Sequence, residues 1–542
     1  MGINEQFSLL EGGMEMKVLV SDKLGDAGVK LFEKEEGIDV DVKTGLSPDE
    51  LKAVIGDYDA LVVRSATKVT EEILEAAENL KVIGRAGIGV DNIDVEGATK
   101  RGIIVMNTPT GNVVTTAEHA IAMMMSLTRN IPQGTASMKA GRWDKKKLQG
   151  REIYNKTFGV IGFGKIGSIV ANRARGLKMR VIVYDPVVTP EKIEKAGCES
   201  VSLNELYSQA DYMSVHVPKS KKTLGLINKK AFDQMKEGAM LINCARGGIV
   251  DEDALYEALQ SGKIAGAALD VFSEEPPPED LPLLQMDNVI ATPHLGASTA
   301  EAQTNVAVMV AKQIISFLKT NTVENALNTP SVSGKDLEKL NPFIFLAERM
   351  GRLQGQLVSG HVKEIKIEYN GNFEDVDLKP VTTAFLTGLL DLLSMEDVNA
   401  VNAPYLAKED GIKVSESTSD EAMEYNHLLT MEVITNETSS FVSGTVFGRN
   451  YPRVVKINDF RLEMKPEGYL TLIHNLNIPG EIGSIGTLLG EKNINISKMT
   501  VGQETDGERN IVFLRTDSAL SDEILDGLRN LPMSKSVTYL EL

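Results

Sequence analysis

Short apolar runs alternate with amphipathic segments through roughly the first half of the chain. The runs are bounded by glycine, proline and polar clusters, as strands are, and between them apolar residues recur every three or four positions, as in helices. This alternation is typical of α/β folds with parallel sheets. The predicted strands are Val18–Ser21, Ala60–Val63, Val82–Gly84, Ile103–Met106, Phe158–Ile161, Val181–Tyr184, Tyr212–Val217, Ala239–Asn243, Gly266–Phe272 and Val289–Thr292.

Two long amphipathic segments, Thr116–Thr128 and Glu301–Leu318, divide these strands into two groups. Both are long enough to be helices that connect one α/β unit with another. The simplest arrangement is a discontinuous first unit with a second unit inserted in it, and the cleft between them is where we expect a ligand. The predicted boundaries are an extension at 1–16, a first unit at 17–112 and 296–328, and an inserted unit at 113–295.

The pattern changes after about residue 330. The segment VSGKDLEKLNP (332–342) is expected to be a linker. A strand (Val362–Tyr369), an apolar helix (Thr382–Leu393) and β-rich runs between Leu428 and Ile457 follow it, which predicts an α+β unit at 329–460.

The last part of the chain, residues 468–542, shows the order strand, helix, strand, strand, helix, strand. The runs are TLIHN, EIGSIGTLLGEK, INISKMTV, NIVFLRTD, SDEILDGLRN and SVTYLEL. This order predicts a ferredoxin-like unit. Its central strands carry no Gly-rich or aromatic RNA-binding signature.

The segment from Thr157 to Asp185 carries every part of a dinucleotide-binding βαβ unit in order. A short apolar strand leads into a GxGxxG turn formed by Gly162, Gly164 and Gly167, which lets the backbone approach a pyrophosphate at a helix N-terminus. The second strand ends on Asp185, whose carboxylate can accept from both ribose hydroxyls and would repel a 2′-phosphate. We therefore expect NAD as the cofactor. The alternative is a glycine turn in an ordinary α/β sheet.

Charge and composition restrict the class of partner. The 542 residues carry 57 basic and 76 acidic groups, a net charge of −19, which argues against nucleic acid or an anionic membrane but allows a local basic pocket. Cys198 and Cys244 form no metal or disulfide pattern, so we expect no metal and a cytoplasmic location. No apolar run approaches the ~18 residues that span a bilayer. The acidic N-terminal residues do not form a signal peptide.

Three polar residues follow strands of the inserted unit at the edge where parallel sheets bind ligands: Arg246, Glu275 and His294. An imidazole can take the hydroxyl proton of a 2-hydroxy acid while hydride leaves for a nicotinamide, and a neighbouring acid fixes its tautomer. An arginine can clamp the carboxylate and polarise the forming carbonyl. Each residue alone could be a cap or a loop support, and we expect such a structural role for His216 in SVHVP.

Six motifs resemble, in order, the signatures of the D-isomer-specific 2-hydroxyacid dehydrogenases over about residues 17–328: GRAGIGVDNID, VMNTPTGN, VIGFGKIG, NCARGGIVDE, ALDVFSEEPP and TPHLGAST. Arg64 in VVRSATKVT, Arg85 in VIGRAGIG and the segment ASMKAGRWDKKK are similar to the branch of that family that oxidises 3-phosphoglycerate. The remaining C-terminal residues resemble the intervening domain and the terminal ACT domain of the long form of that branch.

The resemblance implies NAD-dependent oxidation of 3-phosphoglycerate to 3-phosphohydroxypyruvate, the first committed step of L-serine biosynthesis. It implies a Rossmann-type doubly wound parallel sheet inserted in a discontinuous flavodoxin-like substrate domain, then an intervening α+β regulatory domain and a ferredoxin-like ACT domain. A homodimer or homotetramer is also implied. Arg246, Glu275 and His294 would carry catalysis, with His294 as general base and Glu275 as its partner.

The family pattern also assigns binding residues. The cofactor positions are Gly162, Gly164, Lys165, Ile166, Gly167, Asp185, Cys244, Ala245, Arg246, Asp270, His294 and Gly296. The substrate positions are Arg64, Ser65, Arg85, Gly87 and Asn107. Ile88 and Val217 stand where relatives often carry threonine near the cofactor, so we expect no side-chain hydrogen bond there.

Two other functions stay open. Another dehydrogenase of the family, of the glyoxylate or lactate type, would need no phosphate-binding arginine and would lack the C-terminal tail. A non-catalytic NAD sensor on the same fold would have no need of the three catalytic residues, although some sensors retain them.

The C-terminal unit could bind L-serine as a feedback effector. Pro479 and Gly480 start a predicted helix, where free backbone N–H groups can meet a carboxylate. Asn477 precedes that turn and Asn495 opens the next strand, and His474 is a third predicted contact, although its spacing to the Pro-Gly pair is one residue longer than usual. The alternative is a purely structural dimerisation unit.

Overall fold

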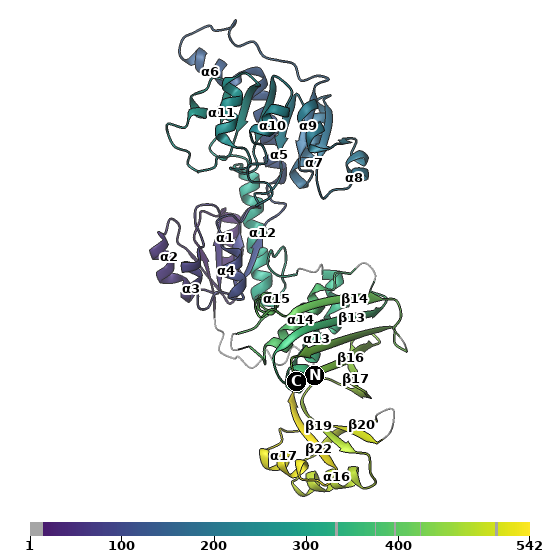
Figure 1. Cartoon of the computed structure of the whole chain (residues 1–542). Coiled ribbons are helices and arrows are strands. Elements are labelled where there is room, and N and C mark those ends of the chain that lie inside the picture. The colour runs from purple at the N-terminus through teal and green to yellow at the C-terminus, as the bar shows by residue number, and fades with distance from the viewer. Residues whose placement is uncertain (1–14, 331–333, 374–375, 395–396, 423, 504–507) are drawn as a thin grey trace.

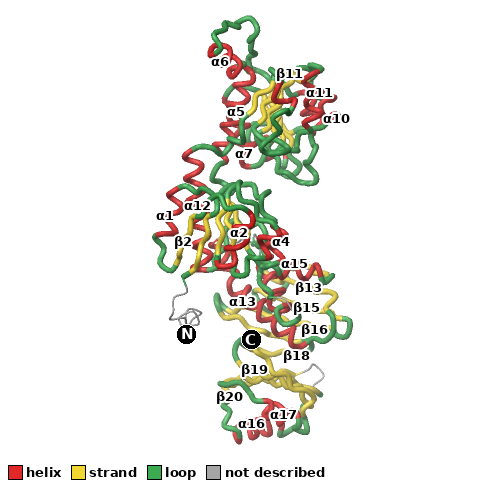
Figure 2. Tube along the Cα trace, turned by 90° about the vertical axis from the view of Figure 1, so that its left-hand side faces the viewer, coloured by secondary structure: helices red, strands yellow, loops and turns green. Residues whose placement is uncertain are grey.

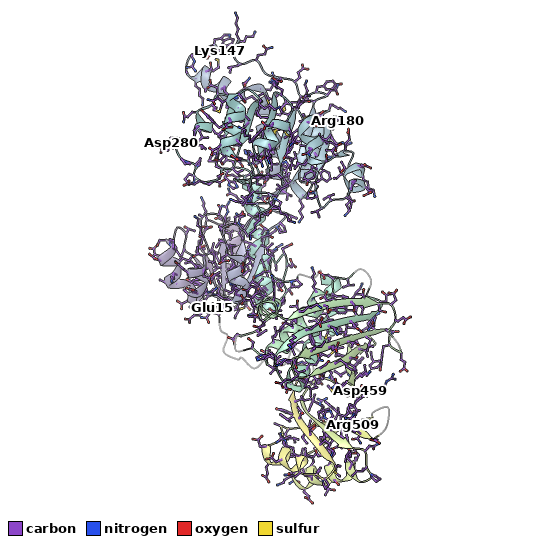
Figure 3. All side chains as sticks on the ribbon, viewed as in Figure 1. Glu15, Lys147, Arg180, Asp280, Asp459 and Arg509 are labelled. Carbon is purple, nitrogen blue, oxygen red and sulfur yellow. The ribbon has the colours of Figure 1, made fainter. Side chains whose placement is uncertain are left out.

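The computed structural model describes residues 15–330, 334–373, 376–394, 397–422, 424–503 and 508–542. Figure 1 shows four sheet-based units in a row, from the inserted unit at one end to the C-terminal unit at the other. Charged side chains such as Lys147 and Asp280 lie at the periphery (Figure 3). No described helix combines the length and the apolarity needed to cross a membrane.

The first sheet contains five parallel strands in the order β2-β1-β3-β4-β5, which is flavodoxin-like. The central strands are buried and apolar because helices cover both faces. The strands are β1 (Met16–Val20), β2 (Ile38–Val42), β3 (Ala60–Val63), β4 (Val82–Arg85) and β5 (Ile104–Asn107). The helices are α1 (Asp26–Glu33), α2 (Pro48–Val54), the 3₁₀ turn η1 (Ile55–Asp57), α3 (Glu71–Glu75) and α4 (Val95–Lys100).

The second sheet contains seven parallel strands in the order β12-β11-β10-β9-β6-β7-β8, a Rossmann-type order extended by one strand. Its strands are β6 (Thr157–Ile161), β7 (Arg180–Tyr184), β8 (Glu199–Ser200), β9 (Tyr212–Val215), β10 (Ala239–Asn243), β11 (Ile264–Leu269) and β12 (Val289–Ala291). Its helices are α5 (Val113–Arg129), α6 (Ile131–Lys139), α7 (Lys165–Gly176), α8 (Pro190–Lys195), α9 (Leu203–Gln209), α10 (Lys229–Gln234), α11 (Glu252–Gln260) and the 3₁₀ turn η2 (Pro282–Gln285).

Helix α12 (Ala300–Thr320) returns the chain from the second sheet to the first (Figure 2). It packs closely on α1 and β4. A Cβ atom on Gly28 would lie 2.6 Å from the carbonyl oxygen of Ala307, and one on Gly84 would lie 2.6 Å from side-chain atoms of Val310 and Ile314. This close packing fixes the end of the helix nearest the first sheet.

The intervening unit is a six-stranded mixed sheet in the order β14-β13-β15-β16-β17-β18. Its strands are β13 (Val362–Gly371), β14 (Lys413–Ser419), β15 (His427–Thr435), β16 (Ser439–Phe447), β17 (Tyr451–Ile457) and β18 (Phe460–Met464), and its helices are α13 (Gly334–Leu357), α14 (Lys379–Leu390) and α15 (Ala403–Glu409).

The predicted linker at 332–342 is wrong for residues 334–342, which form the first turns of α13. Residues 332–333 lie outside the described part of the chain. The polar composition of this stretch and Pro342 suggested a linker, but Leu340, Leu346 and Met350 bury one face of the helix in the core of the intervening unit.

The C-terminal unit pairs its strands antiparallel in the order β20-β21-β19-β22, which is ferredoxin-like. Its elements are β19 (Tyr469–Leu476), α16 (Glu481–Glu491), β20 (Ile496–Gln503), β21 (Arg509–Thr516), α17 (Asp522–Arg529) and β22 (Ser534–Glu541).

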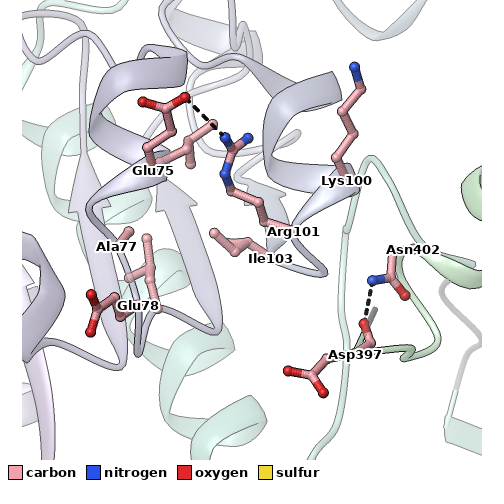
Figure 4. Close-up of a pocket in the computed structure, with 10 residues that line it drawn as sticks. Glu75, Ala77, Glu78, Lys100, Arg101, Ile103, Asp397 and Asn402 are labelled. Carbon is pink, nitrogen blue, oxygen red and sulfur yellow. Dashed lines mark hydrogen bonds and ion pairs between the residues drawn. The ribbon is translucent and has the colours of Figure 1, made fainter. Parts of the chain in front are cut away.

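A pocket of about 340 Å³ lies where the first unit meets the intervening unit (Figure 4). Leu74, Ala77 and Ile103 line it from the first unit, and Asp397 and Asn402 line it from the intervening unit. Its two cations have partners, because Arg101 pairs with Glu71 and Glu75 on α3 and Lys100 lies 3.9 Å from Glu96. The pocket lies at the C-terminal end of α4, at the junction between the first and the intervening unit.

Candidate active site

The GxGxxG turn between β6 and α7 brings backbone close to backbone. Gly162 has φ +96°, and a Cβ atom there would lie 2.7 Å from the carbonyl oxygen of His216. A Cβ atom on Gly167 would lie 2.0 Å from the carbonyl oxygen of Gly162. Gly164 is the N-cap of α7, and no side chain caps the N–H groups of its first turn. The turn therefore fits the pyrophosphate of a dinucleotide, which would lie beside Lys165 and Ile166.

Asp185 closes the second strand of this βαβ unit. Its Oδ2 accepts from the backbone N–H of Phe163 at 2.6 Å, and its Oδ1 accepts from Val187 and Val188 at 2.8 and 2.9 Å. Burial by itself raises the pKa of this carboxyl, but the three backbone donors outweigh it and the pKa is lowered. A fixed negative charge thus stands where the adenosine ribose would bind.

His294 and Glu275 form a close pair beyond the ends of β11 and β12. Nδ1 of His294 lies 2.7 Å from Oε2 of Glu275, and Oε1 of Glu275 accepts from the backbone N–H of Phe272 at 3.1 Å. Since the carboxylate engages Nδ1, that nitrogen carries the proton and the lone pair of Nε2 can accept a proton from a substrate. The imidazole is 47% exposed, so a substrate can reach it. Its backbone φ of +53° is uncommon for a residue with a side chain.

Asp270 holds the loop that carries His294. This fully buried carboxylate accepts from the Thr292 hydroxyl at 2.5 Å and from the backbone N–H groups of Leu295 and Gly296 at 2.7 and 2.8 Å. Burial alone raises the pKa of Asp270. The hydrogen bonds from His119, Thr292 and Leu295 outweigh this effect, so the pKa lies below its usual value. Asp270 and Gly296, which the sequence places at the cofactor, thus contact each other and fix the His294 loop.

The residues after β10 surround a buried thiol. Burial, and then the charge of Asp270, raise the pKa of Cys244 well above its usual value, so this side chain is a neutral thiol. Asn243 accepts from the backbone N–H of Ala245 and donates to the carbonyl of Arg246, which shapes the turn. Among the described residues, His119, Cys244 and Asp270 carry side chains that can bind a metal ion and lie close together. The carboxylate of Asp270, however, already accepts hydrogen bonds from its neighbours.

Three arginines, Arg64, Arg85 and Arg246, lie near one another where the first and second units meet. Burial lowers the pKa of Arg85 to about 10, the charges of Arg246 and Arg64 lower it as well, and Asp91 and Asp22 act in the opposite direction. The Nε atom of Arg85 is buried and has no protein hydrogen-bond partner. Gly87, at φ +155°, lies against this guanidinium, because a Cβ atom there would be 1.9 Å from Nη1. Mutually repelling cations with an unused donor would be stabilised by an anionic ligand.

The other residues predicted to bind the substrate are Arg64, Ser65 and Asn107. Arg64 donates from Nη1 to the carbonyl of Lys23 at 3.1 Å, and Ser65 follows it in an exposed loop. Asp22 accepts from the backbone N–H groups of Arg64 and Thr67, and so fixes the 64–67 loop. The Asn107 amide donates to the carbonyl of Ile88 at 2.5 Å, so it supports the loop beside Arg85.

Asp22 and Asn92 were missed at the sequence level. Asn92 donates to the carbonyls of Arg64 and Thr67 at 2.8 and 2.6 Å. Asp22 lies two residues after the end of β1, so its position after a parallel strand was the available signal. Asn92 lies in the GRAGIGVDNID motif, but its partners are more than twenty residues away and only the fold reveals them.

His216 fits the structural role expected for it. It is half-buried, its Nε2 lies 2.8 Å from the hydroxyl of Ser214, and desolvation lowers its pKa to about 4. It is therefore neutral and packs beneath the glycine turn.

The predicted effector residues of the C-terminal unit have separate partners. His474 packs edge-on against Phe460 and lies 3.1 Å from the hydroxyl of Ser536. Asn495 donates to Asp517 at 2.5 Å. The Asn477 side chain accepts a 3.5 Å contact from Asn510.

Beside Asn477 lies a buried polar cluster that sequence reasoning missed. Asn475 and Asn510 each donate to the buried carboxylate of Glu481 at 2.6 Å, at the first turn of α16. Alternation along β19 puts Asn475 and His474 on opposite faces of the sheet. His474 is therefore turned away from this helix terminus.

The glycine turn, the ionised Asp185 and the pair of His294 and Glu275 at one sheet edge define an NAD-dependent dehydrogenase. The family model described as D-isomer specific 2-hydroxyacid dehydrogenase, NAD binding domain, matches residues 121–296. The model described as D-3-phosphoglycerate dehydrogenase intervening domain matches residues 339–458.

Relatives match over almost the whole chain. D-3-phosphoglycerate dehydrogenase of Archaeoglobus fulgidus is 43% identical over 97% of this chain and 100% of its own length. The Bacillus subtilis enzyme of the same name is 42% identical over 97% of this chain and 99% of its own. This chain belongs to the D-3-phosphoglycerate dehydrogenase family.

A solved structure resembles more than half of this chain. D-lactate dehydrogenase from Aquifex aeolicus, complexed with NAD and lactic acid, is 31% identical, with a TM-score of 0.53 over 58% of this chain and 100% of that chain. Together with the matching NAD-binding domain, it supports NAD as the cofactor here.

Proposed function

We propose that this chain oxidises 3-phosphoglycerate to 3-phosphohydroxypyruvate with NAD, as the first committed step of L-serine biosynthesis. One observation carries the choice of substrate: Arg64, Arg85 and Arg246 lie near one another in a protein with a net charge of −19. A substrate with one carboxylate would not need all three, whereas a phosphorylated hydroxy acid does. The names of the relatives agree with this substrate.

The residues divide the reaction between them. The terminal nitrogens of Arg246 bind the substrate carboxylate, and Arg64 and Arg85 bind the phosphate. Nε2 of His294 accepts the hydroxyl proton at C2, and Glu275 stabilises the imidazolium through Nδ1. When bound, NAD supplies the acceptor for the hydride that leaves C2. The products are thus a ketone, a reduced cofactor and one proton on His294, so atoms and charge balance.

The test is NADH absorbance with purified protein, NAD and a panel of 2-hydroxy acids. We expect NADH formation with 3-phosphoglycerate and far less with D-lactate or glycolate. Oxidation of D-lactate or glycolate at an equal rate would favour the lactate or glyoxylate alternative. Tight NAD binding without turnover on any member of the panel would favour the sensor.

Cofactor choice is expected to follow Asp185. Val187 is 86% exposed beside it, so the pair Asp185→Ser and Val187→Arg removes the repulsion of a 2′-phosphate and adds a partner for it. The ratio of kcat/KM for NADP over NAD should rise by at least about tenfold, the value of one charge-assisted contact. Val187→Arg alone is the control and should change the ratio much less. A wild-type protein that prefers NADP would contradict the role of Asp185.

We propose further that the chain acts as a homodimer, or as a homotetramer. The support is a set of large apolar side chains exposed around α6 and the segment that follows it: Ile131 at 53%, Met138 at 57%, Trp143 at 78% and Tyr154 at 62%. Apolar side chains exposed in this way are typical of an interface between copies.

We propose the domain boundaries that the sequence predicts: a substrate domain at 17–112 and 296–328, an NAD-binding domain at 113–295, an intervening domain at 329–460 and a C-terminal domain at 468–542.

We also propose that the C-terminal unit is an ACT domain that binds L-serine. Its ferredoxin-like order and the uncapped turn at Gly480, φ +93°, before α16 support this. L-serine at millimolar or lower concentration should inhibit turnover, and Asn477→Ala or Asn495→Ala should relieve inhibition without changing kcat.

Asn530→Ala, at the end of α17 in the same unit, is the matched control and should leave inhibition intact. A chain that ends before residue 468 should stay active and insensitive. Calorimetry that detects no serine binding, together with turnover that serine never slows, would reject the regulatory role and leave the dehydrogenase unaffected.

A further inference from the structure

Asp91 of the first unit pairs with Arg246 of the second. Nε of Arg246 donates to Oδ2 of Asp91 at 2.9 Å, although 155 residues separate the two in sequence. Asp91 lies in the loop between β4 and α4 of the first sheet, and Arg246 follows β10 of the second. The ion pair therefore joins the first and second units beside the site proposed for the substrate.

The same contacts determine which face of the guanidinium stays available. Nη1 of Arg246 donates to the carbonyl of Ala245 at 2.7 Å. A Cβ atom on Gly89 would lie 1.7 Å from Nη2, so the guanidinium rests directly on the backbone of the Asp91 loop. Since Asp91 takes Nε and Ala245 takes one N–H of Nη1, the fork of the two terminal nitrogens is left for a ligand.

The loop that carries Asp91 also supports the other two arginines. Gly87 lies against the Arg85 guanidinium, and Asn92 donates to the carbonyl of Arg64 at 2.8 Å. The carboxylate of Asp91 also opposes the repulsion among these cations, since it raises the pKa of Arg85. A shift of this loop would therefore move all three cations with respect to the nicotinamide site.

We propose that Asp91 is a positioning residue for the dehydrogenase reaction. It holds Arg246 so that the two terminal nitrogens meet the substrate carboxylate, and it fixes the position of the first unit relative to the second. The pair is partly exposed, with side chains 27% and 51% accessible, so it adds little to folding. Its effect falls on substrate binding and orientation. The proposal rests on the oxidation of a 2-hydroxy acid and is independent of the phosphate.

The test is a double-mutant cycle between Asp91→Asn and Arg246→Lys, assayed with whichever 2-hydroxy acid the wild-type chain oxidises fastest. Asp91→Asn should lower kcat/KM by about 10- to 100-fold, the value of a hydrogen bond between charged groups. The loss should appear mainly in KM, with the Kd for NADH unchanged. In the Arg246→Lys background the same substitution should cost less than about threefold.

Asp39→Asn, on β2 of the same sheet, makes the same charge change away from the cleft and should leave kcat/KM within about twofold of wild type. If Arg246→Lys is too slow to assay, Asp91→Glu decides: partial recovery over Asp91→Asn supports the proposal, and no recovery contradicts it. Equal losses in both backgrounds, or an Asp91→Asn variant with wild-type KM, would overturn it. Failure of 3-phosphoglycerate as a substrate would leave this test valid, so the two proposals fail separately.

Discussion

Replacing His294 by alanine should lower kcat by a factor of about 10² to 10⁴, which is the usual contribution of a positioned general base. The reason is that Nε2 of His294 is the acceptor that the pairing of Nδ1 with Glu275 leaves for the hydroxyl proton. Binding of NADH should be retained, because the glycine turn and Asp185 lie on other elements of the sheet. Steady-state kinetics and a fluorescence titration with NADH measure both effects.

The control for this variant is His361→Ala, at an exposed position before β13 of the intervening unit, which should keep wild-type kcat. Glu275→Gln is the companion variant. It removes the carboxylate charge that faces Nδ1 and stabilises the imidazolium as it forms, so kcat should fall while NADH binding is retained. Unchanged turnover in His294→Ala or in Glu275→Gln would remove this pair from the mechanism.

Replacing Arg85 by alanine should lower kcat/KM for 3-phosphoglycerate by about 10- to 100-fold and lower that for D-glycerate much less. The Nε atom of Arg85 is buried and has no protein partner, and the other two arginines repel this side chain, so we expect an anionic group of the substrate to supply the missing partner. Loss of one charged hydrogen bond of about 1.5–3 kcal/mol accounts for the size of the effect. Arg64→Ala should act in the same direction.

Arg101→Ala is a matched control for Arg85→Ala, because Arg101 lies in the same unit at the other end of α4 and pairs with Glu71 and Glu75. It should leave the ratio of kcat/KM for the phosphorylated and unphosphorylated substrates unchanged. Equal losses on both substrates in Arg85→Ala would show that this arginine does not recognise the phosphate.

Most of the fold follows from the sequence because parallel strands buried on both faces are continuous apolar runs. Ala60–Val63 and Ala239–Asn243 coincide with β3 and β10. Strands β2 and β8 were missed because both are short, polar strands at sheet edges: IDVDV alternates with aspartates, and β8 is only two residues long. Helix α13 was missed in part because its first turns are polar and its apolar face meets partners far along the chain.

The residues of the candidate site could also be predicted only in part. Arg246, Glu275 and His294 could be found from position alone, since each follows a strand whose end faces the cleft. The residues that hold them could not. Asp91 meets Arg246 over 155 residues of sequence, and Asp270 holds the His294 loop from another strand. The sequence gives no measure of such pairings, because they depend on how the two sheets meet.

The most direct test of the central claim compares kcat/KM for 3-phosphoglycerate and D-glycerate on one preparation of the wild-type chain, with NAD and NADH absorbance as the readout. Three convergent arginines predict a preference of at least about 10²-fold for the phosphorylated acid, since two or more charged hydrogen bonds reach the phosphate only. Equal values for the two acids, or a preference for D-glycerate, would contradict the assignment of the arginine cluster to a phosphorylated 2-hydroxy acid.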